Sequence, residues 1–147
     1  MLSYSLVLVP QLLSTLFQYL FPSDFDNNKK VFFQPPGYVF AINWTVIYTL
    51  LGIYLFKLVN GRKTNQYFVF MAAVYAINLS LNMAWTPMVN IQKNYKGGVF
   101  TIALMIFTTF LLMAIDDNRV NRTLLVPYVS WLFVALLLNV ELARMNQ

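Results

Sequence analysis

The chain has 147 residues, of which 59% are hydrophobic and 10% are charged. Soluble domains carry roughly 25% charged residues, so the composition excludes a soluble monomer, a nucleic-acid-binding module and a disordered segment. The sequence contains no Cys and no His, which removes disulfides, thiol nucleophiles and the commonest metal ligand. We therefore expect a protein that is embedded in a membrane, with the lipid bilayer as its partner.

The charged residues leave five uncharged intervals, which are 1–23, 31–56, 64–92, 97–115 and 123–140. Each is long enough for a membrane-spanning helix, which needs roughly 20 mostly apolar residues. The intervals lack the polar–apolar alternation of barrel strands, the other structure that can cross lipid. The sequence thus predicts an all-α fold with a single integral membrane domain over 1–147. Its five transmembrane helices are expected near 2–21, 36–57, 67–88, 98–115 and 123–142.

The first interval is expected to remain in the membrane rather than to be cleaved as a signal peptide. No Lys or Arg precedes Lys29, and no small-x-small cleavage site follows the apolar run. The ten Lys and Arg residues divide equally between the two sides of a five-helix bundle. The positive-inside rule therefore predicts no direction of insertion.

Small residues form a stripe along the third predicted span. At about 100° per residue, Ala72, Ala76 and Ser80 share one side of a helix. Small side chains let two helix backbones approach closely in lipid, so this face is a predicted homodimer seam. An equally weighted interpretation is that these residues pack within one bundle.

Polar and aromatic residues recur on what should be the inward faces of the spans. Gln11, Ser14 and Gln18 form a polar stripe on the first span. Trp44 and Trp131 lie too deep in their spans for the aromatic belts at the membrane surface. Inward rings with a few amides suit a flat, largely apolar ligand. The ligand-binding residues that we predict are Tyr38, Trp44, Tyr48, Asn78, Asn82, Trp85, Tyr128, Trp131, Ala135 and Asn139.

Three segments resemble the motifs of one membrane protein family. Residues 34–52 read QPPGYVFAINWTVIYTLLG and are similar to PPxWVFGPVWTxLYxxMG. Residues 78–87 read NLSLNMAWTP and are similar to QLALNxxWxP, while 124–139 are similar to LLxPYLxWxxFAxxLN. The chain therefore resembles the translocator protein (TspO/MBR) family, whose bacterial members are called tryptophan-rich sensory proteins and whose animal members are called peripheral benzodiazepine receptors.

The resemblance implies a five-helix bundle, often homodimeric, with a pocket among the helices. Family members bind tetrapyrroles, so it implies non-covalent binding of a porphyrin (protoporphyrin IX or heme), with sterols or benzodiazepine-site compounds as further ligands. Some bacterial members promote light-dependent porphyrin breakdown, and Trp44 and Trp131 match the pocket tryptophans implicated in it. The membrane implied is a mitochondrial outer membrane, an endomembrane or a bacterial membrane.

The sequence also departs from the family pattern. The family's Gly-Pro before the second-span tryptophan is replaced by Ala41-Ile42. The aromatic segment of the loop at 24–33, a pocket lid in relatives, has no counterpart here. Val140 stands where the cholesterol-recognition pattern of animal members needs a tyrosine, so sterol binding is not our prediction.

The leading hypothesis is a membrane receptor that binds a planar ligand in a sensing, transport or porphyrin-handling role. Two alternatives stay open: a transporter of small lipophilic solutes, and an assembly protein that binds no small molecule. No titratable pair is expected to face the bundle, so we predict no catalytic or metal-binding residues. Light-driven porphyrin breakdown needs no such groups and stays open as well.

Overall fold

The computed structural model describes residues 4–22 and 37–145, and all of their regular secondary structure is helical. A short 3-10 helix, η1 (Tyr4–Leu8), leads into α1 (Val9–Leu20). Four longer helices follow: α2 (Gly37–Asn60), α3 (Phe68–Asn90), α4 (Tyr95–Ile115) and α5 (Arg119–Met145). The predicted all-α class is confirmed. The loop at 24–33 lies outside the described residues.

The four longer helices are each long and apolar enough to cross a membrane. Their ends extend past most of the predicted limits, since α2 continues to Asn60 and α5 begins at Arg119. Charged side chains at helix ends can reach the headgroups, so a charge does not end a membrane helix. At the start of α4, the Asn94 side chain accepts a hydrogen bond from the Gly97 amide at 3.0 Å. This N-cap explains why α4 begins before the predicted residue 98.

The first helical segment is shorter than the predicted span 2–21. Pro10 lies at the start of α1, and proline is tolerated in the first helical turn but not farther along, because it lacks an amide proton and its ring clashes with the preceding turn. The preceding residues accordingly form the tighter η1. At 1.5 Å per α-helical residue and 2.0 Å per 3-10 residue, η1 and α1 together are about 28 Å long. This nearly matches the roughly 30 Å hydrocarbon core of a bilayer.

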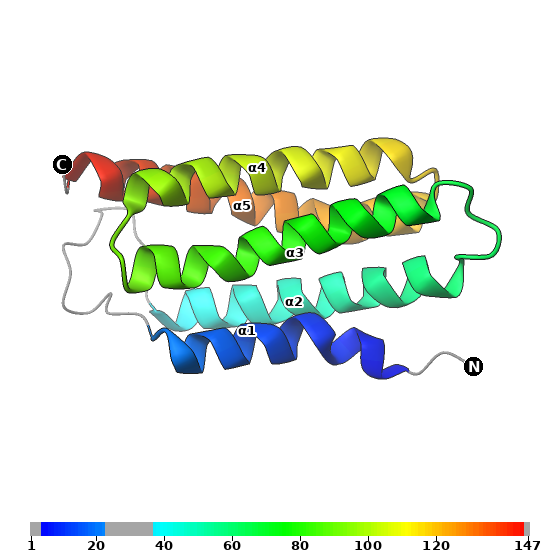
Figure 1. Ribbon diagram of the computed structural model, residues 1–147, viewed down its shortest axis with the longest axis horizontal. Helices are drawn as coiled ribbons and strands as arrows, with labels where there is room; N and C mark the ends of the chain where they lie inside the picture. The colour runs from blue at the N-terminus through cyan, green and yellow to red at the C-terminus, as the bar shows by residue number, and fades with distance from the viewer. Residues whose placement is uncertain (1–3, 23–36, 146–147) are drawn as a thin grey trace.

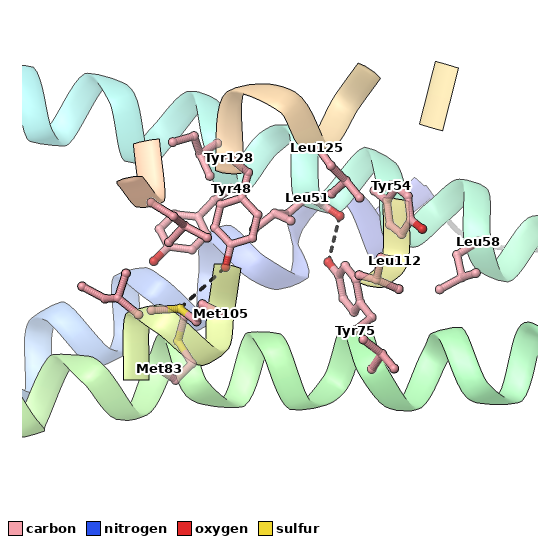
Figure 2. Close-up of a cluster of buried hydrophobic side chains, with 14 of the residues drawn as sticks. Tyr48, Leu51, Tyr54, Leu58, Tyr75, Met83, Met105, Leu112, Leu125 and Tyr128 are labelled. Carbon is pink, nitrogen blue, oxygen red and sulfur yellow. Dashed lines mark hydrogen bonds between the residues drawn. The ribbon is translucent and has the colours of Figure 1, made fainter. Parts of the chain in front are cut away.

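The helices run along one common direction (Figure 1). Helix α1 packs along α2, and α3 packs mainly on α4. Helix α5 contacts both α4 and α2. Helices α2 and α3 make few backbone contacts with each other, and tyrosine side chains bridge them instead. Figure 2 shows one such bridge, in which the Tyr75 hydroxyl donates to the Leu51 carbonyl at 2.8 Å.

A buried carboxylate joins three helices near the C-terminal end of α2. The fully buried ring of Tyr54 stacks on Tyr75 at 6.0 Å, and its hydroxyl donates to Asp116 Oδ2 at 2.9 Å. The same carboxylate accepts hydrogen bonds from the Asn118 amide and the Asn121 side chain. Asp116 therefore fixes the turn between α4 and α5 and attaches it to α2.

Candidate ligand-binding cavity

A cavity of about 510 Å³ lies among all five helices. Pockets for small molecules typically measure 300–1,000 Å³. Helix α1 contributes polar side chains, α2 and α5 contribute aromatic rings, and α3 and α5 contribute amides. The lining residues are Gln11, Ser14, Thr15, Gln18, Phe40, Ala41, Trp44, Thr45, Tyr48, Asn82, Trp85, Thr86, Asn90, Ile102, Met105, Trp131, Leu132, Ala135, Leu138, Asn139 and Leu142. None of them carries a charge, so the part of a guest that lies against these residues is expected to be neutral and mainly apolar.

Aromatic rings from α2 and α5 build one wall of the cavity. Trp44 stacks on Tyr48 with ring centroids 5.3 Å apart and planes 24° apart. Trp131 meets Trp44 edge-on at 6.2 Å and Phe40 edge-on at 5.5 Å. Both geometries are the favourable ones for aromatic pairs. Phe40, Trp44 and Tyr48 follow one another in α2 at intervals of four residues, which places their rings on one face of the helix.

A chain of hydrogen bonds runs from the cavity wall into the bundle. The Tyr48 hydroxyl donates to Asn82 Oδ1 at 2.6 Å, and Asn82 Nδ2 donates to the Tyr128 hydroxyl at 3.1 Å. The Tyr128 hydroxyl donates to Asn78 Oδ1 at 2.6 Å. Asn78 Nδ2 in turn contacts the Thr108 and Thr109 hydroxyls and the Met105 carbonyl. The chain links α2, α3, α4 and α5 through polar groups that would be costly in contact with lipid.

A second polar contact lies between α3 and α5. The Trp85 indole donates to Asn139 Oδ1 at 3.2 Å, and Asn139 Nδ2 donates to the Ala135 carbonyl at 2.9 Å. Gly98 of α4 lies directly against this pair. A Cβ atom at position 98 would stand 2.8 Å from Asn139 Oδ1 and 3.3 Å from the Trp85 indole nitrogen. The glycine therefore permits α4 to approach the Trp85–Asn139 pair.

The sequence profile of the TspO/MBR family matches residues 5–145. The chain belongs to the TspO/MBR family. With four helices able to span a bilayer, this TspO/MBR protein is an integral, multi-pass membrane protein.

Individual proteins are also similar over most of the chain. Protein CrtK of Rhodobacter capsulatus is 29% identical over 125 residues, which cover 83% of this chain and 78% of the relative. Tryptophan-rich protein TspO of Archaeoglobus fulgidus is 31% identical over 119 residues, or 80% of this chain and 76% of the relative. The protein of the same name from Chlorobaculum tepidum is 31% identical over 120 residues, or 80% and 75%.

Seven of the ten predicted ligand-binding residues line the cavity: Trp44, Tyr48, Asn82, Trp85, Trp131, Ala135 and Asn139. Tyr38 does not, since its side chain is 69% exposed at the start of α2. Asn78 and Tyr128 are buried behind the wall, in the hydrogen-bond chain described above. Helical periodicity predicts that a side chain points inward, but not whether it meets the cavity or a neighbouring helix.

Several cavity residues were not among the predicted binding residues. Phe40 lies one helical turn before Trp44, and that four-residue spacing could have identified it. The predicted polar stripe of the first span consists of Gln11, Ser14 and Gln18, and the structure places all three on the wall. Asn90 lines the cavity while its side chain donates to the Phe21 carbonyl at 2.9 Å. No sequence pattern indicates that contact, because it joins positions 69 residues apart.

The predicted seam lies on the opposite side of α3 from the cavity. Ala76 and Ser80 are exposed and Ala72 is half-buried. On the same helix, Asn78 and Asn82 are buried. On the third span, the amide-bearing face therefore points into the bundle, and the small-residue face points outward; whether that face forms a homodimer seam stays a prediction.

Proposed function

We propose that this protein binds a planar, largely apolar molecule of the porphyrin type in the cavity among its helices. The observation that carries the proposal is the position of the tryptophans: the sequence has three, and all three line the uncharged cavity. Flat aromatic walls favour a flat guest through stacking, and the few polar groups fix its orientation.

Recognition would depend on the macrocycle rather than on a metal. The usual axial ligands of heme iron include His and Cys, and the chain contains neither. The resemblance that links the three tryptophan-bearing segments to tetrapyrrole-binding relatives supports the same class of guest. A sensing or storage role needs only this binding step.

Tryptophan fluorescence provides a direct test, because every indole in the chain lies on the cavity wall. We expect saturable quenching when protoporphyrin IX is added to the purified protein in detergent. The double variant Trp44→Phe/Trp131→Phe retains Trp85 as the reporter and should bind the porphyrin more weakly. Free N-acetyltryptophanamide controls for absorption of light by the porphyrin. Equal binding curves for the wild type and the double variant would refute the proposal.

Light-driven breakdown of the bound porphyrin is a second candidate function. The edge-on contact between Trp44 and Trp131 at 6.2 Å favours it, because it places two indoles together on the cavity wall and photochemistry through these rings needs no acid–base pair. We expect such activity to appear as a loss of porphyrin absorbance under illumination that requires both indoles. A rate that is unchanged in the double variant would leave binding alone as the function.

Transport of a lipophilic solute would use the same cavity. No charged residue lines it, which disfavours coupling to protons or ions. Flux of a porphyrin into proteoliposomes, absent from protein-free vesicles, is the result that would favour a transporter.

The outward small-residue face of α3 supports a homodimer as the quaternary structure. Ala76 and Ser80 leave room for the backbone of a second α3, and close backbone approach is what associates helices in lipid. The alternative of a ligand-free assembly protein would use the same face, and it predicts no thermal stabilisation by any tetrapyrrole.

A further inference from the structure

A groove of about 220 Å³ lies between α2 and α5 on the outer side of the bundle. Trp131 lines both this groove and the cavity, while the other groove residues do not line the cavity. Apolar side chains make up most of the lining, and two polar side chains lie among them, Asn43 of α2 and Ser130 of α5. Val46 and Ser130 are exposed, so the groove opens toward the lipid and not toward the cavity.

The two polar side chains of the groove have hydrogen-bonding groups that the protein does not use. Asn43 Nδ2 donates one hydrogen bond, to the Val39 carbonyl of its own helix at 2.9 Å. A carboxamide offers two N–H donors and an acceptor oxygen, so its oxygen and second N–H have no partner within residues 4–22 and 37–145. The Ser130 hydroxyl has none within the same residues. Both side chains are accessible, since Asn43 is half-buried and Ser130 is exposed.

Both side chains lie within the hydrocarbon layer of the membrane. At 1.5 Å per residue, Asn43 is about 9 Å from the first residue of α2, and Ser130 is near the middle of α5. The layer is roughly 30 Å thick, and it provides no water to hydrogen-bond with exposed polar groups. Because polar groups without a partner are costly in lipid, a protein neighbour is the favoured occupant of the groove.

We propose that the groove between α2 and α5 is a self-association surface that receives α2 of a second copy of this chain. Copies that insert in the same direction hold Asn43 at the same depth, so a twofold axis along the membrane normal brings the two carboxamides together. Each carboxamide then donates an N–H to the oxygen of the other, because an amide carries both a donor and an acceptor. The interface is isologous, and each copy supplies both a helix and a groove.

Exposed apolar side chains beside Asn43 fit this arrangement. Ile42 and Val46 are 60% and 51% exposed and lie one turn apart on α2. They form a ridge of the kind that packs into the groove between two helices. The Ser130 hydroxyl can donate to a backbone carbonyl of the entering helix. This surface belongs to α2 and α5, whereas the small-residue face belongs to α3, so the inference does not depend on the predicted seam or on the guest of the cavity.

Cysteine cross-linking at position 42 tests the inference, because the chain has no Cys of its own. In oxidised phosphatidylcholine vesicles, Ile42→Cys should form a disulfide-linked dimer. Adding Asn43→Leu should slow the cross-linking about tenfold at a dilution where association is incomplete, because the reciprocal hydrogen bonds are lost. Adding Ser130→Ala instead should slow it as well. Asn43→Leu removes a hydrogen bond within α2 alone, so thermal melting of the variant should show an intact fold.

Thr49→Val is the matched control for the loss of a polar side chain. Thr49 is exposed on the same helix, but its hydroxyl already donates to the Thr45 carbonyl at 2.8 Å, so cross-linking at position 42 should not change. Asn43→Leu should also leave the cross-linking of Ser80→Cys on α3 unchanged. A rate at position 42 that survives Asn43→Leu would overturn the inference. Absence of cross-linking at position 42 would leave the groove to lipid and overturn it too.

Discussion

At the residue scale, the asparagines decide how polar the cavity is. Asn82 lies on the wall, but its carboxamide accepts a hydrogen bond from Tyr48 and donates one to Tyr128. The guest therefore meets aromatic rings and already bonded amides. This arrangement keeps the cavity largely apolar although its wall contains four Asn and Gln side chains from α1 and α3 together with Asn139.

Replacing Asn82 with Leu should destabilise the protein, because it leaves the Tyr48 and Tyr128 hydroxyls without these partners. We expect the free energy of unfolding to fall by about 1–3 kcal/mol. The measurement is SDS-induced unfolding in mixed micelles, followed by circular dichroism. Asn43→Leu is the control: within residues 4–22 and 37–145, the half-buried Asn43 side chain bonds only to the Val39 carbonyl of its own helix, so a change below about 0.5 kcal/mol is expected. Equal effects of the two substitutions would contradict the role of the network.

Iron should contribute little to porphyrin binding. With neither His nor Cys in the chain, Met105 is the thioether on the cavity wall that could ligate heme. We expect protoporphyrin IX and heme to bind with affinities within a few-fold of each other. Met105→Leu should leave the ratio of the two affinities unchanged. Much tighter heme binding that this variant abolishes would show that the metal is recognised.

At the element scale, glycines set how closely the helices approach. A Cβ at Gly52 would overlap the Val7 backbone carbonyl, so η1 packs directly on the backbone of α2. A Cβ at Gly98 would instead meet side chains, with the Val89 methyl 2.7 Å away. Side chains can rotate away, whereas the backbone of a packed helix must move as a unit.

The three substitutions Gly52→Ala, Gly98→Ala and Gly61→Ala should therefore rank in that order of destabilisation. Gly52→Ala should lower the melting temperature most, because η1 has to move away from α2. Gly98→Ala should cost about 1–3 kcal/mol and shift the Trp85 emission. At Gly61 the nearest atom to a new Cβ is 3.5 Å away, so little change is expected. A Gly52→Ala protein as stable as the wild type would show that η1 does not pack on α2 as described.

At the scale of the whole molecule, the two faces of α3 separate ligand binding from association. The buried amides face the bundle, while Ala76 and Ser80 face outward. An outward surface of small residues lets the backbones of two helices come close, and dispersion contacts then accumulate along both helices.

Cysteine cross-linking can test the predicted homodimer, because the chain has no Cys to interfere. Ser80→Cys should give a disulfide-linked dimer when membranes are oxidised. Phe107→Cys places a cysteine at an exposed position of α4 and should remain monomeric. Cross-linking at position 107 but not at position 80 would place the interface on a different helix.

The sequence by itself determined that this protein lies in a lipid bilayer and that its fold is all-α. It also predicted which side of each helix faces the interior of the bundle. Uncharged intervals of sufficient length become helices in lipid, because a helix forms all the hydrogen bonds of its backbone N–H and C=O groups within its own segment. Helical periodicity then predicted which sides of these helices carry Trp44, Trp85 and Trp131 toward the bundle. Only the tertiary structure decided which inward polar groups meet one another and which meet the cavity. Asn78 and Asn82 lie one turn apart on one face, yet the first contacts α4 and the second lines the cavity. The helical phase fixes the direction of a side chain, but its partner depends on how neighbouring helices are packed.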